Sequence, residues 1–110
     1  MGKFIVGDVV AVPFPFSDLS GKKLRPALVL ATVEHDDVIL CQITSKPFAS
    51  KRAIAVNTGD FQSGGLPAAS YIRPDKLFTA ESTIILKNKG TLRPQLLGTV
   101  LAAVQGLFSS

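Results

Sequence analysis

"GDVVAVPFPFSDLSGKKLRPALVL", residues 7–30, joins two apolar segments through a polar, basic loop and decides the fold. In the first segment, Val10 and Val12 occupy alternate positions as in a β-strand, and the prolines that follow stop it from continuing as a central strand. The second segment, from residue 25 on, is a nearly continuous apolar run. Such a run predicts a buried strand. The stretch therefore predicts two strands connected by a charged loop.

A hairpin is the firmest expectation for the next part of the chain. Residues 25–33 and 37–45 are rich in β-branched and apolar side chains, and the polar letters EHDD lie between them. Two such segments around a short polar turn predict an antiparallel pair of strands.

The middle of the chain predicts further short strands and one long loop. Residues 52–56 and 82–90 have strand character, and residues 70–81 predict a strand that Pro74 should bend or place at a sheet edge. Residues 57–68 are rich in Gly, Asn, Asp and Ser, which predicts a long connecting loop.

After Pro94 the hydrophobic period changes from strand to helix. Apolar residues recur there at steps of three and four, which indicates one face of an amphipathic helix: Leu97, Val100, Leu101, Val104 and Phe108. Pro94 suits the first turn, and Thr91 could cap it. The prediction is a mainly β fold in a single domain, residues 1–110, with a small, strongly bent, barrel-like sheet and a C-terminal α-helix packed on it.

Composition limits the classes of function. The 110 residues are 46% hydrophobic, which is more than one small core needs and predicts a second buried surface such as a homodimer interface. The chain has no apolar run long enough for a membrane span and no secretory signal, so we expect a complete cytoplasmic protein without membrane association. The net charge of +4 favours acidic partners. The single cysteine, Cys41, is expected to be a buried thiol because its neighbours are apolar.

Arg25 opens the second strand beside Lys22 and Lys23, where its planar guanidinium could bind a phosphate at two points. The alternative is a solvated arginine at a strand end.

Thr44 and Ser45 follow an apolar strand, and a hydroxyl there could donate to a phosphate oxygen beside the charge of Lys46. The alternative is an ordinary transition from strand to turn.

The letters RPD place Arg73 and Asp75 two residues apart, and therefore on one face of a strand. Asp75 could accept a proton as a general base while Arg73 neutralises developing negative charge. The alternative is an exposed salt bridge.

The only histidine, His35, falls in the polar turn, and we expect it at the surface. We expect no metal and no cofactor because the chain lacks a cluster of histidines, cysteines or spaced acids.

The opening stretch resembles the PemK/MazF family of toxin-antitoxin endoribonucleases, in which a G-D-V strand, a loop and an R-P-x-L-V strand recur in this order. The resemblance continues through "QITS", "SYIRPDKLFTAE" and the terminal helix, about residues 6–108. It implies a small SH3-like barrel of the CcdB/MazF type, a homodimer, single-stranded RNA as substrate and a cognate antitoxin that covers the RNA groove.

The resemblance also implies roles for residues. The arginine of R-P is catalytic in the family, and Arg25 matches it; a functional Thr or Ser stands at the step of Thr44 and Ser45. Some plasmid-borne members use both residues of R-x-D, which Arg73 and Asp75 match. Those members also carry a histidine in the first loop, and this chain has none there.

Two other functions stay open from the sequence. One is a gyrase poison of the same fold, although the gyrase-poisoning relatives depend on a tryptophan near the C-terminus and this chain has no Trp. The other is a non-catalytic SH3-like module that binds RNA or protein. The sequence does not specify the preferred RNA sequence or the antitoxin.

Overall fold

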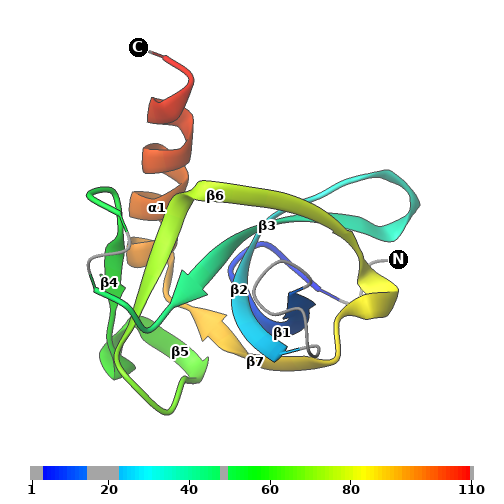
Figure 1. Ribbon diagram of the computed structural model, residues 1–110, viewed down its shortest axis with the longest axis horizontal. Coiled ribbons are helices and arrows are strands. Elements are labelled where there is room, and N and C mark those ends of the chain that lie inside the picture. The colour runs from blue at the N-terminus through cyan, green and yellow to red at the C-terminus, as the bar shows by residue number, and fades with distance from the viewer. Residues whose placement is uncertain (1–3, 15–22, 48–49, 110) are drawn as a thin grey trace.

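The computed structural model describes residues 4–14, 23–47 and 50–109, with only the backbone of Phe14 and Lys23. Within this part, seven strands form one antiparallel sheet in the order β4-β6-β3-β2-β1-β7-β5, and the sheet curls strongly (Figure 1). The predicted mainly β fold with a C-terminal helix is confirmed. The elements are β1 Asp8–Phe14, β2 Lys23–Thr32, β3 Asp37–Thr44, β4 Ile54–Val56, β5 Phe61–Gly64, β6 Ser70–Glu81, β7 Lys87–Leu92 and α1 Pro94–Leu107, with 3₁₀ turns at Glu34–Asp36, Thr58–Asp60 and Ser82–Ile84.

Both faces of the sheet are buried, which explains the nearly continuous apolar runs. Because successive strand residues point to opposite faces, neighbours such as Leu28 and Val29 belong to two different hydrophobic clusters. One cluster lies against α1 and includes Val9, Leu28, Ile43, Ile72 and Val100. The other lies on the opposite face and includes Val10, Val12, Ala27, Val29 and Leu40.

The predicted hairpin forms from β2 and β3, and its turn has an unusual backbone. The amide of Asp37 donates to the carbonyl of Glu34, while His35 and Asp36 both have positive φ, 62° and 63°. Two consecutive residues with positive φ characterise a type I′ turn, which usually carries Asn-Gly. His35 is exposed, as predicted.

Strand β6 is bent, as Pro74 predicts, and the bend is a large bulge (Figure 1). Cys41 of β3 pairs with Leu77, but Ile43 pairs with Ile72, so residues 73–76 stand opposite the single residue Gln42. Pro74 has no N–H to donate to the ladder, which favours an interruption here. The strand does not lie at an edge, because β4 and β3 flank it.

Two expectations for the later part of the chain are wrong. Residues 57–68 are not only a loop, because β5 lies within them and pairs with β7. This pairing brings Gly64 against Gly90, where each backbone lies too close for a Cβ on the other strand. Residues 82–90 start with a 3₁₀ turn, and β7 begins only at Lys87.

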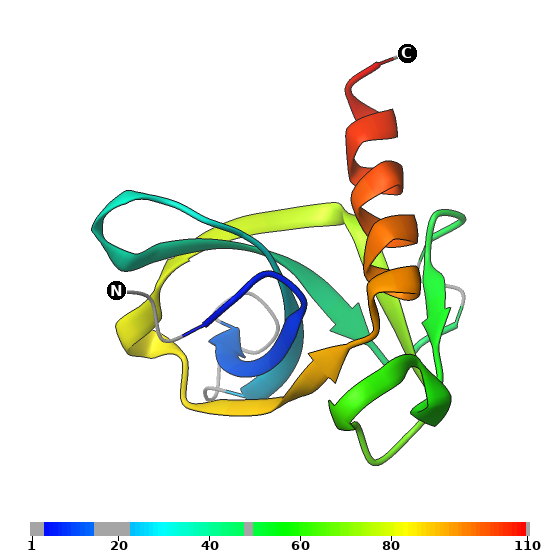
Figure 2. The same cartoon turned by 180° about the vertical axis from the view of Figure 1, so that it is seen from behind.

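Helix α1 starts at Pro94, as predicted, but Thr91 does not cap it. Thr91 lies in β7, and its hydroxyl donates to the buried carboxylate of Asp8 (2.9 Å). Val100 is the buried residue of α1, and the C-terminal half of the helix extends away from the sheet (Figure 2). No helix in the described part of the chain is both long and apolar enough to cross a membrane.

Candidate active site

A hollow of about 310 Å³ brings together three residues that the sequence singled out: Arg25, Thr44 and Ser45. Strands β1, β2, β3 and β7 and the segment before β6 supply its walls. The described lining residues are Ala11, Leu24, Arg25, Pro26, Ile43, Thr44, Ser45, Leu66, Pro67, Ala68, Ser70 and Lys89.

Arg25 has an unsatisfied donor. It lies opposite Val12 of β1, and its Nε is buried without a hydrogen-bond partner in the described structure. A buried N–H that lacks a partner costs about 1–3 kcal/mol. This cost would be offset if a ligand accepted the hydrogen bond.

Gln42 is a second unsatisfied residue, which our sequence reasoning missed. Its Oε1 is buried and has no partner in the part of the chain that the structure describes, and Gln42 pairs with Ala27, two residues along β2 from Arg25. Arg25 and Gln42 therefore lie on the same face of adjacent strands and offer a donor and an acceptor. The signal in the sequence was a lone amide within the apolar strand "VILCQI".

Thr44 is only 7% exposed, and its Oγ1 accepts a hydrogen bond from the amide of Lys46 (3.1 Å). This bond shapes the turn after β3 and leaves the hydroxyl hydrogen free to donate to an oxygen. Ser45 is exposed and lines the hollow, whereas Lys46 is exposed and lies outside the lining.

The described lining is cationic. Arg25 and Lys89 carry the charge, hydroxyls come from Thr44, Ser45 and Ser70, and no carboxylate belongs to the described lining. Lys89, in β7, was also missed, because nothing in the sequence distinguished it from Lys87 two residues earlier. This combination of groups suits a phosphodiester.

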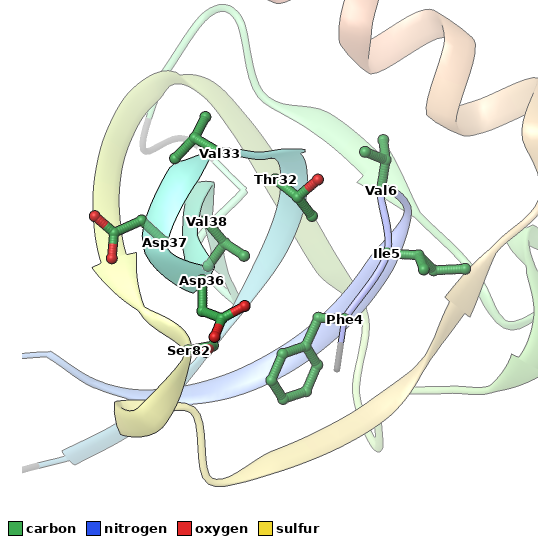
Figure 3. Close-up of a pocket in the computed structure, with 9 residues that line it drawn as sticks. All are labelled: Phe4, Ile5, Val6, Thr32, Val33, Asp36, Asp37, Val38 and Ser82. Carbon is green, nitrogen blue, oxygen red and sulfur yellow. The ribbon is translucent and has the colours of Figure 1, made fainter. Parts of the chain in front are cut away.

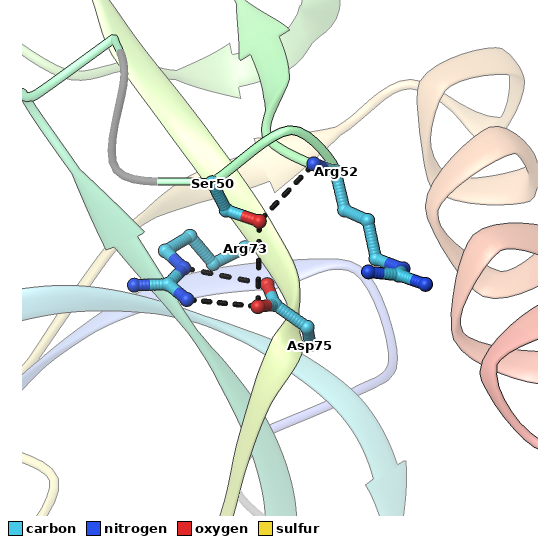
Figure 4. A network of polar contacts seen from close by, with 4 residues as sticks. All are labelled: Ser50, Arg52, Arg73 and Asp75. Atoms are coloured by element: carbon cyan, nitrogen blue, oxygen red, sulfur yellow. Dashed lines mark hydrogen bonds and ion pairs between the residues drawn. The ribbon is translucent and has the colours of Figure 1, made fainter.

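Arg73 and Asp75 form an ion pair in the bulge of β6 (Figure 4). Arg73 donates from Nη2 to Asp75 Oδ2 (2.8 Å) and from Nε to Oδ1 (3.3 Å), and the Ser50 hydroxyl donates to the same carboxylate (3.4 Å). The Arg73 guanidinium holds the pKa of Asp75 below its usual range. A salt bridge, the alternative that the sequence left open, is thus present, but it is half-buried and not exposed, with about one fifth of each side chain accessible.

Neither Arg73 nor Asp75 belongs to the described lining of the hollow. Lys22 and the side chain of Lys23 lie outside the described residues. Cys41 is buried, as predicted, and burial raises the pKa of its thiol to about 12. A thiol that stays protonated is not a nucleophile at neutral pH.

A larger hollow, about 440 Å³, lies at the hairpin end of the molecule (Figure 3). Apolar residues such as Phe4, Ile5 and Val38 line it together with the carboxylates of Asp36 and Asp37. Its described lining contains no Lys or Arg. Two carboxylates would repel a phosphate, so we place the candidate site in the smaller, cationic hollow.

Comparison with known proteins supports this fold. Similar solved structures include an endoribonuclease in complex with its cognate antitoxin from a mycobacterial species (18% identity, TM-score 0.68, 96% of both chains covered) and MazF from Deinococcus radiodurans (16%, 0.71, 96% of both chains). A third is the Mycobacterium tuberculosis toxin MazF-mt6 (19%, 0.70, 92% of this chain and 95% of that chain). No curated protein matches the chain at a significant level. The model of the family "PemK-like, MazF-like toxin of type II toxin-antitoxin system" matches residues 5–108, so the chain belongs to this toxin family.

Proposed function

We propose that this toxin is an endoribonuclease that cleaves single-stranded RNA without a metal ion, by attack of the ribose 2′-OH on the neighbouring phosphate. The observation that carries the proposal is the hollow in which Arg25, Thr44 and Lys89 meet without a described carboxylate. Membership of the family and the likeness to solved endoribonucleases add support.

Arg25 and Thr44 act on the phosphate. As the 2′-oxygen forms its bond to phosphorus, negative charge grows on the non-bridging oxygens, and a fixed guanidinium stabilises that charge more than it stabilises the ground state. The Arg25 Nε, buried and without a partner among the described residues, is positioned to donate to one such oxygen. The Thr44 hydroxyl donates to another, and Ser45 binds the adjoining backbone.

Asp75 is the proposed base. The proton of the 2′-OH passes to its carboxylate, the bond from phosphorus to the 5′-oxygen breaks, and the leaving oxygen takes up a proton from water. Asp75 then returns its proton to the solvent. In the free protein, hydrogen bonds from Arg73 occupy both oxygens of this carboxylate. A lowered pKa makes Asp75 a weak base, so RNA must first draw the Arg73 guanidinium onto a phosphate. Arg73 then neutralises the transition state.

The products and metal requirement test this chemistry. Cleavage should persist in excess EDTA and leave a 2′,3′-cyclic or 3′-terminal phosphate and a free 5′-OH. An RNA oligonucleotide with one 2′-deoxy sugar at the cut site should bind almost normally, because its phosphates remain, but should not be cut. Cleavage of that oligonucleotide, or activity that EDTA abolishes and magnesium restores, would contradict the proposal.

Two further outcomes identify the alternatives. Binding of RNA without discrete fragments would indicate a non-catalytic module. Inhibition of gyrase in a relaxation assay would indicate a gyrase poison. Partners follow from the same proposal: we expect a cognate antitoxin to cover the cationic hollow and to stop cleavage when it is added in equal amount.

A further inference from the structure

We propose that Lys89 binds a second phosphate of the RNA, beside the phosphate that Arg25 holds. This inference rests on the proposed function and extends it, because it names a substrate-binding residue on a different strand. Arg25 comes from β2 and Lys89 from β7, and β1 lies between them in the sheet. Two strand spacings amount to about 10 Å, so these two side chains can contact phosphates of one short RNA segment.

The charges in the hollow support a site for more than one anionic group. Arg25 and Lys89 line the same hollow, and like charges in one hollow repel each other. Within the described residues, the single ion pair is Arg73–Asp75, so no described carboxylate compensates Lys89. A hollow that holds two cations and no described acid is stabilised by a ligand that carries several negative charges.

The backbone fixes the position of Lys89. Its carbonyl oxygen accepts a hydrogen bond from the amide of Gly65 (3.0 Å), and the amide of Gly90 donates to Asn88 Oδ1 (2.9 Å). A Cβ on Gly64 would overlap the carbonyl oxygen of Lys89, so this close contact requires glycine. Lys89 is half-buried as a result, whereas Lys87 on the same strand is exposed and does not line the hollow.

Lys87 therefore provides a matched control. Lys89→Met and Lys87→Met each remove one positive charge from β7 and keep the length of the side chain. The probe is the RNA with a single 2′-deoxy sugar, and its dissociation constant is measured over a series of salt concentrations. For single strands, each lost phosphate contact lowers the slope of log K against log salt by about 0.7.

Lys89→Met should weaken binding severalfold at low salt, by the same factor for RNAs of different sequence. It should also reduce the slope of log K against log salt by about 0.7. Lys87→Met should keep the slope, and Lys89→Arg should restore it. If Lys89→Met does not fold, the salt slopes of Lys89→Gln and Lys89→Arg are compared instead. Equal slopes for the Lys89 and Lys87 variants would overturn the inference while wild-type cleavage still supports the proposed function. A wild type that neither binds nor cuts RNA would overturn the proposed function itself.

Discussion

Arg25 keeps a buried donor that is unpaired among the described residues, which is costly for a residue with only a structural role. Its β2 neighbours Leu24 and Pro26 line the same hollow, so the strand presents the guanidinium from a rigid position. The cost is offset if an oxygen of the substrate accepts the hydrogen bond from the Nε.

Replacement of Arg25 by alanine should therefore abolish RNA cleavage and toxicity while the protein stays folded, because the change removes charge and an unsatisfied donor but little core volume. Cleavage of a long RNA and thermal unfolding are the two measurements. Arg52→Ala, at an exposed position before β4, is the control and should keep activity. Full activity of Arg25→Ala would refute the central assignment.

Asp75 and Thr44 can be ranked by their expected effects. Asp75→Asn should lower the cleavage rate by the ~10²- to 10⁴-fold of a lost acid-base group, with RNA binding kept or tightened. Thr44→Val should cost less, because it removes one neutral hydrogen bond and keeps the shape. Single-turnover rates and dissociation constants separate the two effects. The reverse order would mean that Arg25 and Thr44 perform the chemistry without the pair on β6.

The Arg73–Asp75 pair also predicts an effect of acid on stability. The folded pKa of Asp75 is lowered, mainly by the hydrogen bond from Arg73, so the pair contributes its full stability above the ordinary pKa of 3.8. That contribution is lost as the pH falls through the lower folded pKa. Thermal unfolding as a function of pH should show Asp75→Asn less stable than the wild type at neutral pH and equal to it in strong acid. A constant difference at every pH would contradict this.

The sequence singled out Arg25, Thr44 and Ser45 as candidate site residues because polar side chains are conspicuous next to an apolar run. Arg25 precedes such a run, and Thr44 and Ser45 follow one. The sequence could not identify Lys89, because that residue enters the hollow through the pairing of β7 with β1 and β5, between segments far apart in the chain. Arg73 and Asp75 lie in the bulge of β6, whose extent no local pattern specifies in detail.

At the level of elements, local patterns predicted what local interactions decide. The β2–β3 hairpin and α1 follow from hydrophobic period and turn residues. Strand β5 was missed because its letters, FQSG, have weak strand preference, and its pairing with β7 depends on two glycines with positive φ, Gly64 and Gly90. Tertiary contacts outweigh propensity at such places.

The turn of that hairpin offers a stabilising substitution. Asp36 has φ 63°, a conformation that costs little only for glycine. Asp36→Gly should raise the free energy of unfolding by about 0.5–1 kcal/mol, since the relief of strain exceeds the added freedom of the unfolded chain. Denaturant unfolding measures the change, and RNA cleavage should be unaffected because the turn shares no residue with the cationic hollow.

Asp36→Ala is the matched control for the turn. It removes the same carboxylate but keeps a Cβ at positive φ, so it should not stabilise the protein. If both variants were equally stable, the repulsion between the acids around the turn would explain the effect, and the backbone conformation would not.

For the whole molecule, the two hydrophobic clusters account for much of the apolar surplus, and α1 adds an uncharged surface. This helix of 14 residues contains no charged side chain. Its outer side carries the exposed residues Gly98, Thr99, Ala102 and Gln105, and Phe108 at its end is 76% exposed. An uncharged, uncovered helix face fits a second copy of the chain.

We therefore expect a homodimer in solution, with a mass of about twice 11.6 kDa by light scattering at micromolar concentration. Ala102→Glu places a charge in the proposed interface and should give monomers, whereas Thr58→Glu, at an exposed site outside α1, should not. A monomeric wild type would count against the dimer.

The bulge in β6 also affects how this fold can change during evolution. Before residues 73–76, β6 pairs regularly with β4 and β3. After these residues it pairs regularly with β3. An inserted or deleted residue within an intact strand would reverse every following side chain between the two faces. Within the bulge, the pairing is already interrupted, so a change of length can be absorbed there. The position of a charged pair such as Arg73–Asp75 can thus drift between descendants of one ancestor while both cores keep their register.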